Sequence, residues 1–90
     1  MAYNLAFSKQ ADKELSKLDP SVAKLIVAWL LKNVNGSSNP RFTGKPLKGN
    51  LSSYWRYRVG DYRVLCEIID KELLVLCLHV GNRKEIYDRL

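Results

Sequence analysis

The stretch Tyr54-Trp-Arg-Tyr-Arg-Val-Gly-Asp-Tyr-Arg63 decides the fold of this 90-residue chain. Apolar and basic residues alternate on both sides of Gly60-Asp61, a pattern that predicts two strands joined by a two-residue turn. Arg56 and Arg58 then share one face of the sheet, and Arg63 lies opposite Arg58 on that same face. Like charges directly opposite each other destabilise a sheet. We therefore expect this face to bind an anion.

The same alternation divides the other side chains of the two strands. We assign Tyr57, Val59, Tyr62 and Val64 to a face packed against helices, and the three arginines to an open face. Trp55 falls opposite to Arg56, which favours a place in the core. A three-residue loop with a bulge, in place of the two-residue turn, would move Arg63 to the other face.

Working outward, the pattern predicts three strands, at about 52–59, 62–69 and 72–80, with turns at Gly60-Asp61 and Asp70-Lys71. Residues 35–50 are rich in Gly, Ser, Asn and Pro and are expected to form a loop. Tyr3, Leu5 and Phe7 alternate as in a short first strand. By the same strict alternation His79 shares a face with Val75 and Cys77, so we expect it to pack against the helices rather than to transfer protons.

Two helices are predicted between the first strand and the loop. Ser8 is a suitable N-cap for a helix through Leu18, and Asp19-Pro20 begins a second helix that runs to about Val34. Its expected buried stripe consists of Val22, Leu25, Ile26, Trp29, Leu30 and Val34. The fold class is therefore α+β: an N-terminal strand and a helical hairpin packed on one face of an antiparallel β-sheet (β-α-α-β-β-β), with a short C-terminal turn or helix.

Composition is that of an ordinary globular protein, with 47% hydrophobic and 27% charged residues, and we expect one domain over residues 1–90. No apolar run approaches the roughly 18 residues of a membrane span, and the N-terminus does not resemble a signal peptide, so a cytoplasmic location is expected. Cys66 and Cys77 lie in alternating apolar segments without metal-ligand spacing. We expect both to pack in the core.

The net charge of +6 is concentrated in the middle of the chain. Residues 41–63 contain six bases against Asp61 alone, a net charge of +5. The six are Arg41, Lys45, Lys48, Arg56, Arg58 and Arg63. Such a basic segment interleaved with aromatics is typical of phosphate binding, although a solvated charged surface is the alternative. Lys45, Lys48 and Arg41 are candidate contacts to such phosphates, which the resemblance described below implies to be those of an RNA backbone.

A second informative stretch, His79-Val-Gly-Asn-Arg-Lys-Glu-Ile-Tyr87, follows the third of these strands. Together with Leu51 to Arg63, it resembles the RelE/ParE superfamily of bacterial toxins, the toxin halves of type II toxin–antitoxin pairs. The likeness covers nearly the whole chain. Its most specific parts are the Tyr-Arg that ends at Arg63 and the Val-Gly-x-Arg that ends at Arg83, with Tyr87 downstream.

The resemblance to the RelE branch implies a function. Members of that branch cut messenger RNA on the ribosome, in the site where the next transfer RNA would bind. The implied catalytic residues are Arg56, Arg58, Arg63, Arg83 and Tyr87. The implied reaction is attack of the RNA 2′-hydroxyl on the adjacent phosphorus, with Tyr87 as the candidate base and without a metal or other cofactor. Family members commonly have lysine at position 56 or 58, and arginine, unlike lysine, hardly acts as an acid.

The resemblance also implies partners and leaves two alternatives. The expected partners are a cognate RelB-like antitoxin, an acidic or amphipathic segment that wraps the domain, together with messenger RNA and the ribosome. No membrane is expected, and DNA would be bound only by the toxin–antitoxin complex at its operator. The first alternative is a ParE-like inhibitor of DNA gyrase that cuts no RNA. The second is a non-catalytic nucleic-acid-binding module.

Overall fold

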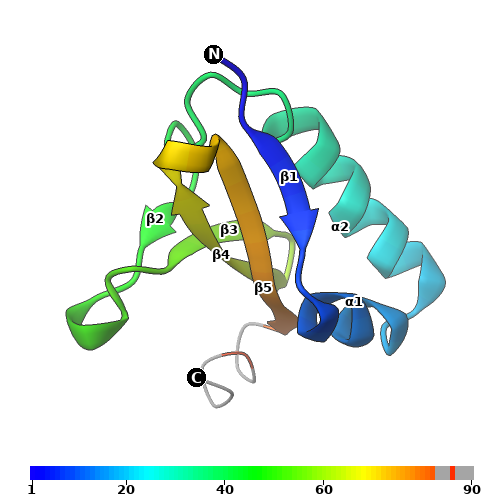
Figure 1. Ribbon diagram of the computed structural model, residues 1–90. Coiled ribbons are helices and arrows are strands. Elements are labelled where there is room, and N and C mark those ends of the chain that lie inside the picture. The colour runs from blue at the N-terminus through cyan, green and yellow to red at the C-terminus, as the bar shows by residue number, and fades with distance from the viewer. Residues whose placement is uncertain (83–85, 87–90) are drawn as a thin grey trace.

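In the residues that the computed structural model describes, 1–82 and 86, two helices lie on one side of a five-stranded sheet (Figure 1). The elements in chain order are β1 Asn4–Phe7, α1 Lys9–Ser16, α2 Pro20–Asn33, β2 Lys45–Pro46, β3 Trp55–Val59, β4 Tyr62–Ile69 and β5 Leu74–Asn82. Short 3-10 helices at Gly49–Leu51 and Asp70–Glu72 precede β3 and β5. Neither α1 nor α2 is long and apolar enough to cross a membrane.

The order of strands across the sheet is β1-β5-β4-β3-β2. The α+β class and the antiparallel pairing of β3, β4 and β5 are confirmed. The sheet is nevertheless mixed rather than wholly antiparallel, because β1 pairs in parallel with β5. Parallel neighbours need a long connection, and the two helices and the meander between β1 and β5 provide it.

Both helices begin where the sequence predicts. The Ser8 hydroxyl accepts a hydrogen bond from the Ala11 amide at 3.0 Å, and the Asp19 carboxylate caps α2, whose first residue is Pro20. The end of α1, however, comes at Ser16 rather than at Leu18. The predicted buried stripe of α2 is wrong at one position, since Leu25 is 63% exposed. The face of α2 that meets the core is centred on Ile26 and Leu30.

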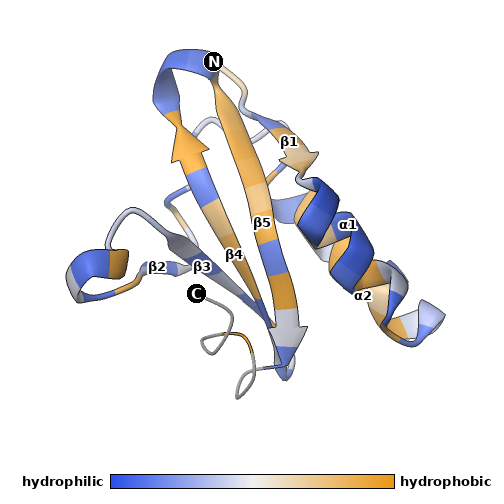
Figure 2. Ribbon diagram, turned by 60° about the horizontal axis from the view of Figure 1, so that its bottom comes forward, coloured by the Kyte–Doolittle hydropathy of each residue, from blue (hydrophilic) through white to orange (hydrophobic). Residues whose placement is uncertain are grey.

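The core lies between the helices and one face of the sheet. Its sheet side includes the four residues Tyr57, Val59, Val64 and Cys66, and the apolar stretches of β4 and β5 stand out in Figure 2. Tyr57 is fully buried, and its hydroxyl donates to the Pro40 carbonyl at 2.5 Å. Cys66 and Cys77 are free and fully buried, as predicted, with their Sγ atoms 3.2 Å apart, and burial raises the pKa of the Cys66 thiol. The face of the sheet opposite to this core is called the open face below.

Strand register confirms the predicted two-residue turn. Arg58 pairs with Arg63, and Val59 with Tyr62, across Gly60-Asp61, where Gly60 has a φ of 59°. The positive φ at the first turn position is typical of a type II′ hairpin. Arg63 therefore stays on the open face, as expected from the sequence.

The predicted face of His79 is wrong. Leu65 pairs with His79 and Cys66 pairs with Cys77, so β5 has one extra residue, Leu78, at this point. Such a bulge reverses the alternation beyond it. Val75 and Cys77 do face the helices, as expected, whereas His79 lies on the open face with Leu65.

Lys45 belongs to a short strand that the sequence did not predict. Residues Lys45–Pro46 pair with β3, so that Lys45 lies next to Arg56. Gly44 makes this approach possible, because a Cβ at this position would lie 2.4 Å from the Arg56 carbonyl oxygen. The Trp55 indole, which donates to the Thr43 carbonyl at 2.8 Å, holds the same turn against β3.

We expect Gly44→Ala to detach β2 from β3. The matched control is Gly49→Ala, because Gly49 also has a positive φ but no atom within 4 Å of an added Cβ. The left-handed backbone alone costs an alanine about 1–2 kcal/mol, which is the loss expected for Gly49→Ala. The loss of unfolding free energy in urea should be clearly larger for Gly44→Ala, and equal losses would contradict a close approach at Gly44.

Candidate nucleic-acid interface

Two rows of residues cross the open face of the sheet. In the first row Arg58 pairs with Arg63, which in turn pairs with Gly81. In the second row each residue pairs with the next, in the order Lys45, Arg56, Leu65 and His79. The structure thus brings four predicted site residues, Lys45, Arg56, Arg58 and Arg63, to one face. Leu65 is fully buried and forms an apolar floor between Arg56 and His79.

The three arginines differ in exposure. Arg58 is exposed and Arg56 is half-buried, whereas Arg63 is only 8% exposed and is less open than expected. Its Nη1 atom lies 3.4 Å from the Gly60 carbonyl oxygen and 3.3 Å from the Tyr62 carbonyl oxygen. These carbonyls keep the guanidinium of Arg63 at the turn end of the sheet. The facing pair Arg58 and Arg63 places two positive charges where an anion would relieve their repulsion.

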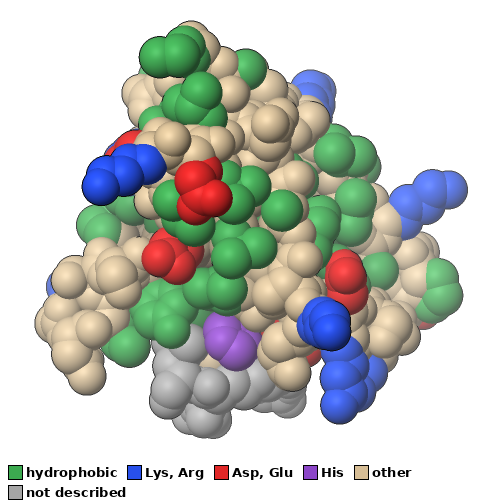
Figure 3. Space-filling view, viewed as in Figure 1, with side chains coloured by type: hydrophobic (Ala, Val, Ile, Leu, Met, Phe, Trp, Pro, Cys, Tyr) green, Lys and Arg blue, Asp and Glu red, His purple; other side chains and the backbone are tan. Residues whose placement is uncertain are grey.

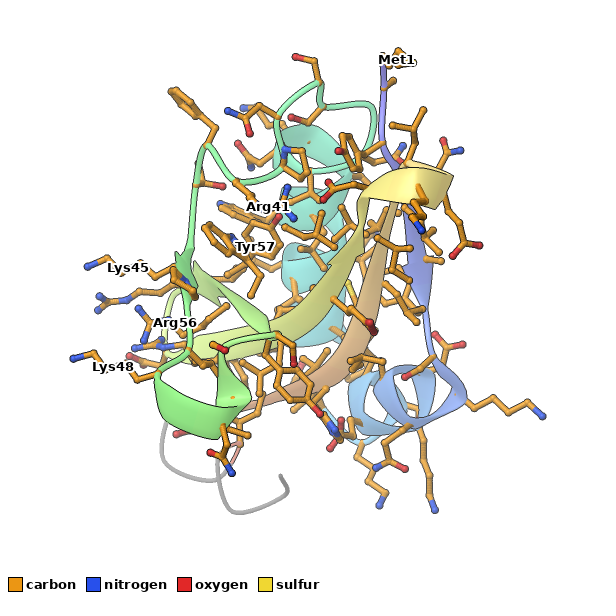
Figure 4. All side chains as sticks on the ribbon, turned by 60° about the vertical axis from the view of Figure 1, so that its left-hand side comes forward. Met1, Arg41, Lys45, Lys48, Arg56 and Tyr57 are labelled. Atoms are coloured by element: carbon orange, nitrogen blue, oxygen red, sulfur yellow. The ribbon has the colours of Figure 1, made fainter. Side chains whose placement is uncertain are left out.

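Two lysines extend the positive surface beyond β3. Lys45 and Lys48 are both exposed, and Figure 4 shows them on the same side of the molecule as Arg56. Lys48 immediately precedes the 3-10 helix Gly49–Leu51. A nucleic acid bound over the open face could therefore continue along β2 with its backbone near these two side chains.

Arg41 is not brought to this group. Its guanidinium forms a two-point ion pair with Asp70, with Nη1–Oδ1 and Nη2–Oδ2 distances of 2.9 and 3.0 Å. The Tyr3 hydroxyl donates to the same carboxylate at 2.6 Å. These hydrogen bonds, from Arg41 first and Tyr3 second, lower the pKa of Asp70. In Figure 4, Arg41 lies apart from Lys45, Arg56 and Lys48.

Two residues that the sequence analysis did not include among its site residues, His79 and Glu14, lie at the edge of this face. The His79 Nδ1 atom lies 3.5 Å from Glu14 Oε1, and Glu14, on α1, is only 4% exposed. The histidine side chain is 20% exposed and reaches the surface in the view of Figure 3. Only the register shift in β5 reveals that this imidazole shares a face with the arginines.

Arg83 and Tyr87, the other two predicted catalytic residues, lie outside the described residues. A cavity of about 450 Å³ lies at the end of β5 that leads toward them, and its lining includes Glu14, Tyr62 and Gly81. Gly81 is the residue opposite Arg63.

Among residues 1–82 and 86, no three His, Cys, Asp or Glu side chains gather as ligands of a metal ion would.

The chain is similar to known toxins over almost its whole length. A family model described as the ParE toxin of the type II toxin–antitoxin system parDE matches residues 5–87. Toxin RelG of Mycobacterium tuberculosis is 34% identical over 89 residues, which are 99% of this chain and 100% of RelG. The mRNA interferase toxin RelE of Escherichia coli K12 is 31% identical, over 97% of this chain and 92% of that protein.

Solved structures agree with these relatives. A chain of the RelBE2 toxin–antitoxin complex of M. tuberculosis superposes with a TM-score of 0.83 at 30% identity, covering 92% of this chain and 93% of that one. A chain of the E. coli RelBE complex gives a TM-score of 0.67 at 26% identity, covering 90% of this chain and 96% of that one. The arrangement of strands and helices described above is thus shared with these toxins, and the chain belongs to the RelE/ParE superfamily of type II toxin–antitoxin toxins, in its RelE-like branch.

Proposed function

We propose that this toxin is an endoribonuclease that cleaves messenger RNA in the ribosomal site where the next transfer RNA would bind, and so inhibits translation. The observation that carries the proposal is the pairing of Arg58 with Arg63 on an open face that also holds Arg56 and Lys45. The name of the E. coli relative, an mRNA interferase, supports the same activity.

The chemistry of the proposed reaction suits fixed cations. The 2′-oxygen of one nucleotide attacks the adjacent phosphorus, and the products are a cyclic phosphate and a free 5′-hydroxyl. Negative charge builds up on the phosphorane oxygens in the transition state, and cations held in place there stabilise it. Arg56, Arg58 and Arg63 have this role in the proposal, since a guanidinium matches phosphate oxygens two at a time.

The remaining predicted residues complete the proposal. Arg83 would add a further cation, and Tyr87 would take the proton of the 2′-hydroxyl. Lys45 and Lys48 would hold the backbone of messenger or ribosomal RNA without selecting its sequence. Arg41, given its ion pair with Asp70, would contribute to such contacts only by leaving that partner.

An antitoxin is the other proposed partner. The similar M. tuberculosis and E. coli structures are toxin–antitoxin complexes, which supports a cognate RelB-like protein for this chain. The net charge of +6 would attract an acidic segment and speed its association. In the proposal this complex, rather than the toxin alone, binds operator DNA.

Mapping of RNA 5′ ends after induction of the toxin in cells tests the function directly. We expect new 5′ ends within translated messenger RNAs, and their loss when translation is blocked beforehand. Intact messenger RNA together with gyrase-linked DNA breaks would instead identify a gyrase inhibitor of the ParE type. Intact RNA and DNA with normal growth would identify a non-catalytic binding module.

Arg58→Ala and Arg63→Ala should each slow cleavage. If each removes one contact to the developing charge, the activation free energy should rise by about 2–4 kcal/mol. Single-turnover cleavage on purified ribosomes measures the effect. Lys24→Ala is the control, because Lys24 is exposed on α2 and lies on the helical side of the sheet. Cleavage by both arginine variants at the wild-type rate would refute the assignment of these residues.

An oxyanion should stabilise the free toxin through the same arginines. We expect sulfate to raise the melting temperature more than sodium chloride does at equal ionic strength, and Arg58→Gln to remove most of this difference. Without sulfate, Arg58→Gln should raise the unfolding free energy by up to about 1 kcal/mol, because it relieves repulsion across the strands. Lys24→Gln should change neither quantity, and an unchanged sulfate effect in Arg58→Gln would exclude this pair as the anion site.

A further inference from the structure

We propose that His79 is the general acid of the cleavage reaction and that Glu14 positions it. The inference rests on the proposed function and supplies a group that the arginines lack. Arginine keeps its proton at every accessible pH, so it stabilises charge but does not protonate a departing oxygen. A histidine can carry a proton and release it near neutral pH.

The strand register puts His79 within reach of the phosphate site. His79 pairs with Leu65, and Arg63 lies two residues before Leu65 on the same face of β4. Such diagonal neighbours on adjacent strands are about 7–8 Å apart, a distance that long side chains span. The Arg63 guanidinium is held at the turn end, so in the proposal the phosphodiester lies between the row of Arg58 and Arg63 and the row of Arg56 and His79, within reach of the imidazole ring.

Glu14 is anchored where a neighbouring strand would otherwise be. β1 ends at Phe7, and α1 lies along the part of β5 that follows. There the Ser8 hydroxyl donates to the Leu78 carbonyl at 3.2 Å, and Glu14 Oε1 accepts from the Val80 amide at 3.1 Å. This buried carboxylate is thus fixed by the backbone of the strand that carries His79.

The anchored carboxylate lies beside one nitrogen of the imidazole. Glu14 Oε1 is 3.5 Å from Nδ1 of His79, and this buried nitrogen makes no hydrogen bond within the described residues. In the proposal the carboxylate orients the imidazole through this nitrogen. The other ring nitrogen, Nε2, is therefore the one left for a substrate on the 20% exposed side chain. A carboxylate that orients an imidazole through one nitrogen, so that the other can transfer a proton, is a recurring arrangement in enzymes.

The proposed step balances without a further reactant. The bond from the 2′-oxygen to phosphorus forms as the bond from phosphorus to the 5′-oxygen breaks. The proton on Nε2 of His79 passes to the 5′-oxygen, which leaves as a hydroxyl. The proton of the 2′-hydroxyl passes to the base, proposed above as Tyr87. The neutral imidazole then regains a proton from water.

A substrate whose leaving group needs no proton distinguishes a general acid from a residue that only maintains the structure. The full-length toxin and its variants would cleave ribosome-bound messenger RNA that carries either oxygen or sulfur at the 5′ bridging position of the mapped cleavage site. Loss of a general acid typically slows a reaction by about 10²–10⁴-fold, which is the loss expected for His79→Gln on the oxygen substrate. On the sulfur substrate its rate should be within a few-fold of the wild type, because a thiolate leaves unprotonated.

Glu14→Gln provides a second variant, since its amide oxygen can still accept from the Val80 amide. It should also be slow on the oxygen substrate and recover on the sulfur substrate. Glu67→Gln is the control: Glu67 is exposed on the open face of β4, and this variant should match the wild type on both substrates. Equal slowing of the His79 variant on both substrates, or no slowing on either, would overturn the inference while the proposed function stands. A wild-type toxin that cleaves neither substrate would overturn both.

Discussion

One extra residue in β5 decides which side chains meet on the open face of this toxin. Cys66 pairs with Cys77 and Leu65 pairs with His79, so Leu78 is an extra residue between the two pairs. Cys77 and Val80 therefore both face the core, although strict alternation would put them on opposite faces of the sheet. The same insertion moves His79 from the core face to the open face, at the edge of β5 beside Glu14 of α1. It also places Gly81 opposite Arg63.

The sheet tolerates the repulsion on its open face because the other face is well packed. Opposed arginines such as Arg58 and Arg63 cost the sheet up to about 1 kcal/mol. Each large apolar side chain buried on the core face contributes roughly 1.5–3 kcal/mol. Tyr57 and Val64, directly paired on β3 and β4, are both fully buried there. The sheet can thus carry the charged rows without loss of the fold.

Features set by neighbouring residues could be predicted from the sequence, whereas features set by distant ones could not. Ser8, Asp19-Pro20 and Gly60-Asp61 act through backbone groups a few residues away, and the elements they begin or join appear as expected. The parallel pairing of β1 depends on a strand 70 residues further along the chain. No characteristic amino-acid pattern marks the bulge at Leu78, so the face of His79 was predicted wrongly. The ion pair of Arg41 with Asp70 likewise joins two segments that only the fold brings together.

The short first strand links the fold to the proposed chemistry. β1 ends at Phe7, and so within the described part of the chain the edge of β5 beyond Leu78 has no strand neighbour. A bare edge leaves backbone groups without partners, and α1 satisfies one of them with the carboxylate of Glu14. The hydrogen bond to the Val80 amide thus holds the carboxylate of Glu14 at the rim of the basic surface. In the proposed reaction the fixed guanidinium groups stabilise negative charge but do not release protons. The proton must then come from a different group, and the imidazole of His79 lies at that rim.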